Sequence, residues 1–323
     1  MNTLHVLVFL ASLLLSWLYR PLALRWGIVD VPTRRSAHDS VIARGGGVAL
    51  LLAFGLGCVA MHVLQWHDLG NFSRILLLMV VLVISGLFDD RGGLRVWFRL
   101  LLYAGVCIVA ATHLLGTELF WLLAFPAALY LLWLLNMFNF MDGIDGLAGS
   151  EAVFVTMTAA LLGISAGVDP LLIQLNILLA SASAGFLVLN WPGASLFLGD
   201  TGSIPLGFLL GALSLNYALD DTVWIYVWLI LLAGFLADTT LTLVWRIVSG
   251  QNFLESHNLH AYQRMSRHWN SHGRVLLLLH AVNLLWLLPL ACMALWFPDF
   301  AVYLLVLAYL PLLAGIWKTH NLP

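Results

Sequence analysis

Apolar stretches of roughly the length of a membrane span follow one another along the whole chain. A helix needs about 20 such residues to cross a bilayer, and no run alternates long enough for the strands of a membrane barrel. The pattern therefore predicts an all-α, polytopic integral membrane protein with about eleven transmembrane helices (10–11), folded as a single transmembrane domain over residues 1–323. The predicted spans are 3–19, 45–64, 74–88, 97–115, 119–135, 147–165, 170–189, 203–219, 223–245, 274–297 and 300–317.

Composition supports this class, because 62% of the 323 residues are apolar and only 9% are charged. An ordinary soluble domain has roughly 25% charged residues. These values exclude a disordered chain, a nucleic-acid-binding protein and a soluble two-domain enzyme. The formal net charge is −2, so no bulk charge points to an acidic partner. The three cysteines lie in apolar runs without metal-binding spacing, which is typical of buried thiols.

The basic residues orient the spans. Thirteen of the fourteen lysines and arginines fall on one side of the predicted layout, and only Arg74 falls on the other. The positive-inside rule then places the N-terminus in the periplasm and the C-terminus in the cytoplasm. The cytoplasmic loops, at about 20–44, 89–96, 136–147, 190–202 and 246–274, are also mostly the longer and more polar ones. We therefore expect an active site that faces the cytoplasm at the bacterial inner membrane.

Two of these loops carry acidic and amide side chains. Asp89 and Asp90 are adjacent carboxylates, which usually share a cation, a metal or a proton; a helix cap is the alternative. In the run at 136–146 the polar residues recur every third position. Such a group could ligate a hard cation and fix phosphate oxygens, while a polar cap and turn is the alternative. The polar residues of this run are Asn136, Asn139, Asp142 and Asp145.

Other loops carry small or basic residues. Asp200 lies in the run Gly-Asp-Thr-Gly-Ser, where small residues let backbone N–H groups approach a phosphate; a plain helix start is the alternative. Arg44 precedes three glycines, which could admit a head group or allow tight packing. The loop at 246–274 carries histidines and arginines that suit a diphosphate. A zinc site and a basic membrane surface are its alternatives. Asp238 lies inside a span, and spacing assigns it no role.

In order and spacing, these motifs resemble those of the polyprenyl-phosphate N-acetylhexosamine-1-phosphate transferases (glycosyltransferase family 4). The resemblance covers nearly the whole chain. It implies a phosphotransferase that moves N-acetylhexosamine-1-phosphate from a UDP-N-acetylhexosamine to undecaprenyl phosphate and releases UMP. It also implies Mg²⁺, with Mn²⁺ as a substitute, and a product that starts O-antigen, lipopolysaccharide or a related glycan.

The resemblance assigns roles to single residues. Asn139 and Asp200 match the metal ligands, and Asp89 matches the aspartate that accepts a proton from the lipid phosphate or organises charge. The other residues that match catalytic carboxylates are Asp90, Asp142 and Asp145. The residues implied to bind substrate are Arg44, Asn136, His257, His260 and Arg264.

The sugar and the assembly stay open at this point. One branch of the family has His-Ile-His-His where this chain has His-Asn-Leu-His at 257–260. GlcNAc and a 6-deoxy sugar such as N-acetylfucosamine or N-acetylquinovosamine are therefore both candidates. Membrane lipids are expected partners, nucleic acid is not, and a homodimer is left open. An ion- or sugar-coupled transporter is the rival function, although transporter sites lie near the midplane of the membrane.

Overall fold

The computed structural model describes residues 2–31, 41–118, 120–251 and 259–319. Its chain forms two compact units, one up to Asn216 and one from Tyr217 onwards. His257 lies outside the described residues.

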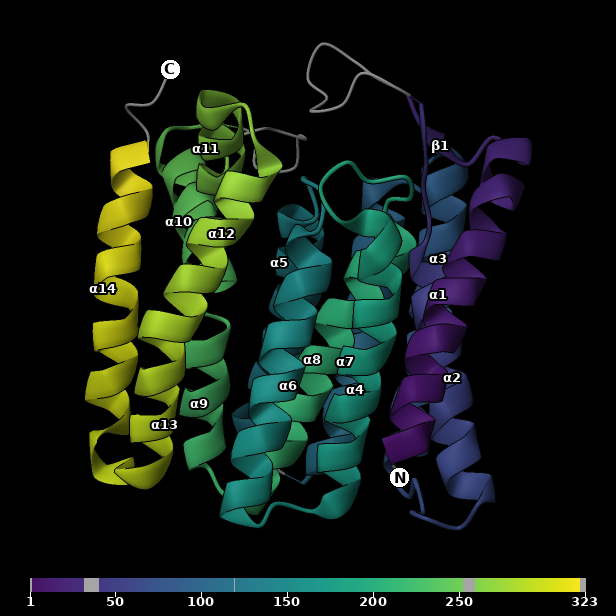
Figure 1. The fold of residues 1–323 in the computed structure, drawn as a ribbon. Helices are drawn as coiled ribbons and strands as arrows, with labels where there is room; N and C mark the ends of the chain where they lie inside the picture. Colours follow the sequence, from purple (N-terminus) through teal and green to yellow (C-terminus); the bar gives the residue numbers. More distant parts are fainter. Residues whose placement is uncertain (1, 32–40, 119, 252–258, 320–323) are drawn as a thin grey trace. The chain divides into compact units, whose positions relative to one another are not determined.

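The first unit is a bundle of long helices that stand side by side (Figure 1). Within it α6 packs against α7, α1 against α2 and α7, and α4 against α5. One end of the bundle carries the C-terminal ends of α1, α3, α5 and α7 and the first turns of α2, α4, α6 and α8. The helices are α1 (Asn2–Arg25), α2 (Gly47–Val63), α3 (Phe72–Gly92), α4 (Val96–Leu115), α5 (Phe125–Met141), α6 (Leu147–Ala166), α7 (Pro170–Asn190) and α8 (Asp200–Asp220).

A short backbone ladder holds this end of the first unit together. Strands β1 (Val29–Asp30) and β2 (Ile42–Ala43) pair antiparallel, and Ala43 also pairs in parallel with Leu196. The ladder continues past β2, since the amide of Gly47 donates to the carbonyl of Leu198 at 3.0 Å. A Cβ on Gly47 would lie 2.1 Å from the Cα of Gly202. Gly47, the last glycine of the run after Arg44, is thus needed for the close packing of two backbones.

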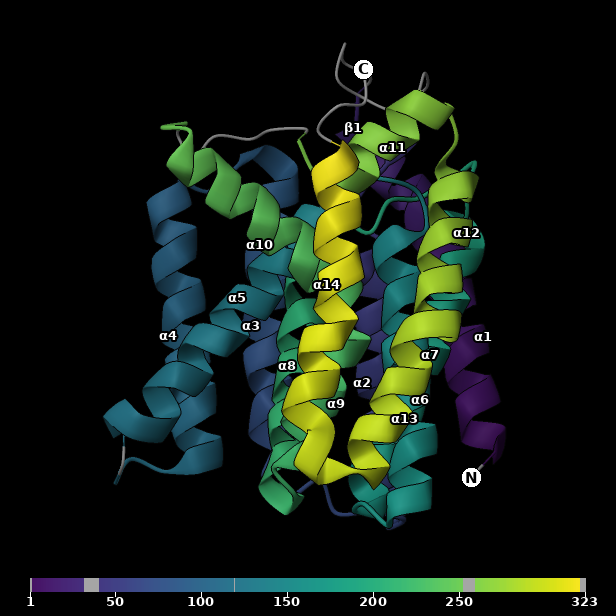
Figure 2. The same ribbon diagram turned by 90° about the vertical axis from the view of Figure 1, so that its left-hand side faces the viewer.

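The second unit consists of α9 (Val223–Leu231), α10 (Ala233–Val248), α11 (Ala261–Trp269), α12 (His272–Val282), α13 (Leu288–Trp296) and α14 (Ala301–Thr319). α9 and α10 meet at a bend of 75°, so α10 lies obliquely to α9 (Figure 2). The short helix α11 begins after His260, and the side chain of Gln263 accepts the amide hydrogen of His260 at 3.3 Å. The predicted loop at 246–274 therefore contains a helix.

The oblique helix α10 has an inverted amphipathic pattern. Its buried side carries polar residues, among them Asp238, Thr242 and Arg246. Its exposed side carries apolar residues, among them Ile247 and Val248. An apolar outer face with a polar inner face suits a helix that contacts lipid and satisfies its polar groups inside the protein.

Two helices of the described chain contain a widened π-helical turn, and each turn ends two residues before a proline. The first turn, η1, spans Phe120–Ala124 and precedes Pro126; the second, η2, spans Asn283–Leu287 and precedes Pro289. Proline has no N–H to donate and its ring clashes with the carbonyl four residues earlier. A turn with one extra residue accommodates the ring without ending the helix.

The all-α, polytopic fold predicted from the sequence is confirmed, and each of the eleven predicted stretches contains a helix. Within the described residues, nine helices are long and apolar enough to span a membrane, and the bent pair α9–α10 makes ten. α2, with 17 residues, is shorter. The predicted boundaries need correction at several loops, because α1 continues to Arg25, α3 continues through Asp90 and α5 continues to Met141. The predicted span 223–245 is two helices, broken at Leu232.

The contact at Gly47 gives a stability test. We expect Gly47→Ala to destabilise the protein by about 1–3 kcal/mol or more, because the new methyl group would meet backbone rather than a movable side chain. Gly55→Ala, in the same helix, has no neighbouring atom within 4 Å and should be neutral or stabilising. Thermal unfolding of both variants in detergent measures the difference. Equal melting temperatures would contradict the close packing.

Candidate functional site

Asp90 is a fully buried carboxylate with several partners at the loop end of the first unit. It belongs to the last turn of α3, and its side chain has no exposed surface. Its oxygens accept hydrogen bonds from the amides of Asp200 and Thr201, both at 3.1 Å, and from the Thr201 hydroxyl at 2.6 Å. Arg44 Nε lies 2.7 Å from Oδ1. Asp90 therefore binds the free N–H groups at the start of α8 and joins three segments of the chain.

Asp89 and Asp200 both contact the same nitrogen, Nη1, of Arg99. The Arg99 guanidinium, on α4, donates to Oδ2 of Asp89 and lies 3.3 Å from Oδ2 of Asp200. Asp89 also accepts the amide hydrogen of Leu94 at 2.7 Å. Arg44 Nη2 donates to Oδ1 of Asp200 at 2.8 Å. Two guanidinium groups thus neutralise an acidic cluster that would otherwise repel itself.

Asn139 faces the same cluster from the last turns of α5. Its Nδ2 donates to Oδ1 of Asp200 at 3.0 Å and to the Ser203 hydroxyl at 3.1 Å. Because an amide nitrogen does not ligate metals, Oδ1 is the one atom of this side chain that could contact a cation. Asn136, one turn earlier, instead donates to the carbonyl of Leu132 in its own helix at 2.7 Å.

Asp145 of the acidic run and Asn190 at the end of α7 hold the loop between α7 and α8 in place. Oδ2 of Asp145 accepts the amides of Gly193 and Ala194 at 3.0 and 3.2 Å. Asn190, which is buried, accepts the amide of Gly146 at 3.1 Å and donates to the carbonyl of Leu196 at 3.0 Å. Asp145 and Asn190 thereby fix the segment that leads into Asp200.

The charges of Asp142 and Arg44 respond to this environment. Burial raises the pKa of Asp142 well above its usual range; Arg44 and the amide of Gly199 oppose that effect, while Asp200 and Asp90 add to it. For Arg44, burial alone would lower the pKa, but the carboxylates of Asp90 and Asp200 outweigh it and raise the pKa. Arg44 therefore stays a cation, and the environment of Asp142 favours its protonated form.

The donor set can be compared with the needs of a divalent cation. Within the described residues no group of three or more His, Cys, Asp or Glu side chains is arranged to hold a metal ion. A cage built only from protein ligands is therefore not present in this part of the chain. Mg²⁺, however, usually binds through one or two carboxylates and completes its shell with water and substrate phosphates. Asp89, Asp200 and Asn139 supply hard oxygen atoms that fit this second arrangement.

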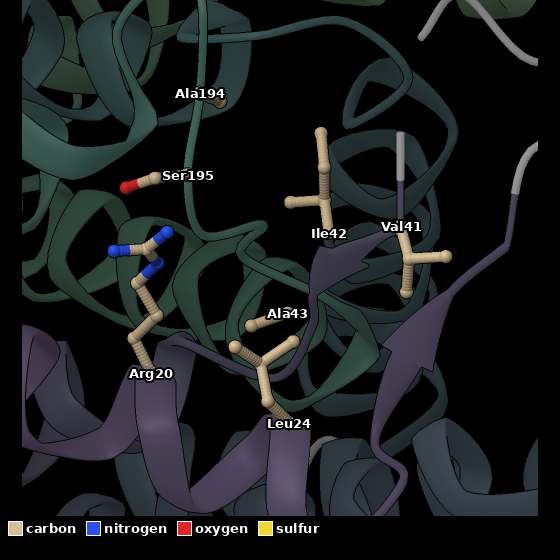
Figure 3. A pocket seen from close by; sticks show the side chains of 7 residues that line it. All are labelled: Arg20, Leu24, Val41, Ile42, Ala43, Ala194 and Ser195. Carbon is tan, nitrogen blue, oxygen red and sulfur yellow. The ribbon is translucent and has the colours of Figure 1, made fainter. Parts of the chain in front are cut away.

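A cavity of about 140 Å³ lies between the end of α1, the segment Val41–Ala43 and the loop before α8 (Figure 3). Its walls come from the end of α1, from β2 and from the loop before α8, and the Arg20 guanidinium lies towards Ser195. The cavity contains none of the acidic residues, although Ala43 in its wall is bonded to Arg44 in the chain.

In the loop predicted at 246–274, the two described residues that were expected to bind substrate, His260 and Arg264, are buried. His260 is buried at the start of α11, with Nδ1 at 3.5 Å from Oδ1 of Asp238. Arg264, also buried, donates from Nε to the Thr319 hydroxyl at 3.2 Å. Burial and the nearby charge of Arg267 lower the pKa of Arg264, although Asp238 partly opposes this.

The structure thus brings together most of the residues predicted in the first unit. The cluster contains Arg44, Asp89, Asp90, Asn139, Asp142 and Asp200. Asp145 bonds a neighbouring loop, and Asn136 bonds its own helix. His260 and Arg264 belong to the second unit. Sequence reasoning missed Arg99, Thr201 and Asn190, because each obtains its role from contacts between segments 44 to 111 residues apart. Spacing gave no signal for Asn190. Thr201 lies in the predicted Gly-Asp-Thr-Gly-Ser run, but its contact with Asp90 was not predicted, and Arg99 was visible as a charge in an apolar helix.

Comparisons with known proteins agree with the sequence motifs. The model of "Glycosyl transferase family 4" matches residues 72–218, the segment that contains α3 to α8. A probable undecaprenyl-phosphate N-acetylglucosaminyl 1-phosphate transferase of Bacillus subtilis is 26% identical over 94% of this chain and 89% of its own length. A decaprenyl-phosphate N-acetylglucosaminephosphotransferase of Mycolicibacterium smegmatis is 28% identical over 81% of this chain and 74% of its own length. A phospho-N-acetylmuramoyl-pentapeptide-transferase of Synechococcus is 31% identical over 68% of this chain and 69% of its own length.

The contacts of Asp90 and Asp142 predict that removing the charge will lower the free energy of unfolding much more at Asp90 than at Asp142. Asp90→Asn should lower the free energy of unfolding by about 3 kcal/mol, because it removes the buried partner of Arg44 and of the amides of α8. Asp142→Asn should change it by less than about 1 kcal/mol, since the charged form of Asp142 is already disfavoured. Thermal unfolding in detergent gives both values. A larger loss for Asp142→Asn would refute this assignment of roles.

Proposed function

Because the chain belongs to glycosyl transferase family 4, the polyprenyl-phosphate N-acetylhexosamine-1-phosphate transferases, we propose that it transfers N-acetylhexosamine-1-phosphate from a UDP-sugar to undecaprenyl phosphate. The products are undecaprenyl-diphosphate-sugar and UMP. The observation that carries the proposal is the cluster of Asp89, Asp200 and Asn139 with two arginines at one end of the first unit. Such a cluster can hold phosphate groups and neutralise their charge.

In the proposed reaction, a phosphate oxygen of the lipid attacks the β-phosphorus of the UDP-sugar. The bond from that phosphorus to the bridging oxygen breaks, and the electron pair leaves on UMP. Several negative charges converge, so the protein must chiefly orient the two substrates in line and neutralise charge. Arg44 and Arg99 can do this, since each guanidinium has further donors besides those bonded to the carboxylates.

Asp89 can either take a proton from the lipid phosphate or organise charge. Its bonds to the Arg99 guanidinium and the Leu94 amide favour the second role, because both stabilise an ionised carboxylate. Mg²⁺, held through Asp200 and Asn139 with Asp89 nearby, would supply additional neutralisation of the phosphate oxygens. Asp90 would act indirectly, by holding α8 and hence Asp200 in place. Asp142, Asp145 and Asn136 remain candidates for contacts with the nucleotide or its phosphates.

The donor sugar is the finer part of the proposal. The two relatives whose names specify N-acetylglucosamine suggest GlcNAc as one donor. A 6-deoxy N-acetylhexosamine is the second candidate donor, because in the segment 257–260 Asn258 and Leu259 stand where one branch of the family has Ile-His. We assign donor recognition to this segment, with His257, His260 and Arg264. The product would then start O-antigen, lipopolysaccharide or a related glycan.

A direct assay tests the reaction. Purified protein is given one radiolabelled UDP-sugar at a time, with undecaprenyl phosphate and Mg²⁺, and labelled lipid is extracted. We expect transfer from UDP-GlcNAc or from a 6-deoxy donor, together with release of UMP. Asp200→Asn should fold yet lose most of the rate, because a cation ligand and the partner of two arginines becomes neutral.

Three controls test the role of the cluster charges, the need for a divalent cation and the reaction itself. Arg95→Gln removes a charge one turn before Arg99 on an exposed side chain, and it should keep the rate. Full activity in EDTA would remove the divalent cation from the mechanism. Absence of lipid-linked label from every UDP-N-acetylhexosamine would reject the proposed function itself.

The proposed orientation, with the cluster facing the cytoplasm of a bacterial inner membrane, has its own test. The basic residues Arg20, Arg44, Arg91 and Arg95 lie at the same end of the first unit as the cluster. A reporter inserted near Asp169, which precedes α7 at the other end of the first unit, should therefore report a periplasmic location. By the distribution of basic residues along the sequence, one fused after Lys318 should report a cytoplasmic location. The reverse pair of signals would place the cluster outside the cell.

A further inference from the structure

Asp238 is a buried carboxylate that the proposed reaction does not use. It lies in α10, and its side chain is 5% exposed. Oδ1 accepts hydrogen bonds from the amide of Ala261 at 2.8 Å and from the Thr242 hydroxyl at 3.2 Å. Oδ2 accepts the amide of Tyr262 at 3.1 Å. All these donors belong to the second unit, so the charge of Asp238 is compensated by hydrogen bonds within that unit.

The partners of Asp238 are the first two amides of α11. The first amides of a helix have no partner inside it, and they carry the positive end of the helix dipole. A carboxylate bound there stabilises the helix start, and the helix start compensates a charge that would be costly in an apolar environment. Because the carboxylate belongs to α10 and the amides to α11, this contact fixes the position of one helix on the other.

The residue at this junction is His260. It is the N-cap of α11, it is bonded to Ala261 in the chain, and its Nδ1 lies 3.5 Å from Oδ1 of Asp238. Its ring also stacks on Tyr262, with 5.8 Å between ring centroids. Further along, Arg264 ties α11 to the end of α14 through Thr319. Any shift of the start of α11 would therefore move the imidazole of His260 directly.

We propose that Asp238 is a positioning residue, which fixes the start of α11 and thereby the imidazole of His260 for contact with the donor substrate. The part of this inference that concerns the donor rests on the proposed function. The part that concerns α11 rests on the contacts within the second unit alone. The two parts can be tested separately.

Hydrogen exchange tests the structural part. In Asp238→Asn the new amide nitrogen would face one of the two backbone N–H groups, donor against donor. We expect exchange in residues 261–264 to become roughly tenfold faster or more, the factor for loss of a hydrogen bond to a charged group. Thr242→Val is the matched control. It removes another donor to the same carboxylate but touches no amide of α11, so exchange there should stay unchanged.

A double-mutant cycle tests the functional part, with UDP-GlcNAc, or whichever UDP-sugar the enzyme accepts, and undecaprenyl phosphate as substrates. Asp238→Asn and His260→Ala should each raise the KM for the donor about tenfold and leave the KM for the lipid unchanged. If Asp238 acts through His260, the double variant should be no worse than the poorer single variant. A residue that only stabilised the fold would lower the amount of active enzyme without this split.

Two results would overturn the inference. One is unchanged exchange of α11 in Asp238→Asn. The other is multiplication of the two losses in the double variant, which would mean that the residues act independently. A wild-type protein that transfers no sugar would reject the proposed function, and the exchange experiment would still decide whether Asp238 fixes α11.

Discussion

The acidic cluster of the first unit depends on one contact, in which a buried carboxylate of one helix accepts hydrogen bonds from the first backbone amides of another helix. Asp90 of α3 binds the amides of Asp200 and Thr201 at the start of α8. The charge could not remain in an apolar environment without such donors. In turn, the contact places Asp200 next to Arg44 and Arg99. Asp238 of α10 binds the start of α11 in the same way. Each unit thus uses a side chain of one helix to fix the first turn of another.

The arginines complete this arrangement in the first unit. Arg44 contacts both Asp90 and Asp200, and Arg99 contacts both Asp89 and Asp200. Each guanidinium therefore joins a carboxylate of α3 to the carboxylate that begins α8. Such a network holds several acidic groups close together, because each pair of carboxylates shares a guanidinium group that offsets their repulsion. Gly47 is part of the same construction, because the absence of a side chain there lets the backbone after Arg44 lie against Thr201 and Gly202 at the start of α8.

The sequence predicted the helices, and it predicted most of the acidic cluster, because both signals are local. Long apolar runs reveal α1 to α8, and the polar residues Asn136, Asn139, Asp142 and Asp145, three positions apart, mark the end of the bundle at which the cluster lies, although α5 continues to Met141. The division of labour among the carboxylates was not predictable. Asp89 and Asp90 are neighbours in the chain, yet one faces Arg99 and the other is fully enclosed by α8 and Arg44. Asn190 was missed for the same reason, since its two partners are defined only by the folded loops.

The widened turns before Pro126 and Pro289 have a consequence for helix register. An α-helix advances by about 100° per residue, and the π-helical turn contains one residue more than the regular helix would need. The turn at Asn283–Leu287 therefore rotates the whole of α13 relative to α12 by about that angle. The side of α13 that faces the protein, with Leu290, Ala291 and Ala294 buried, is set by this single added residue. A deletion of one residue there would turn that side towards lipid.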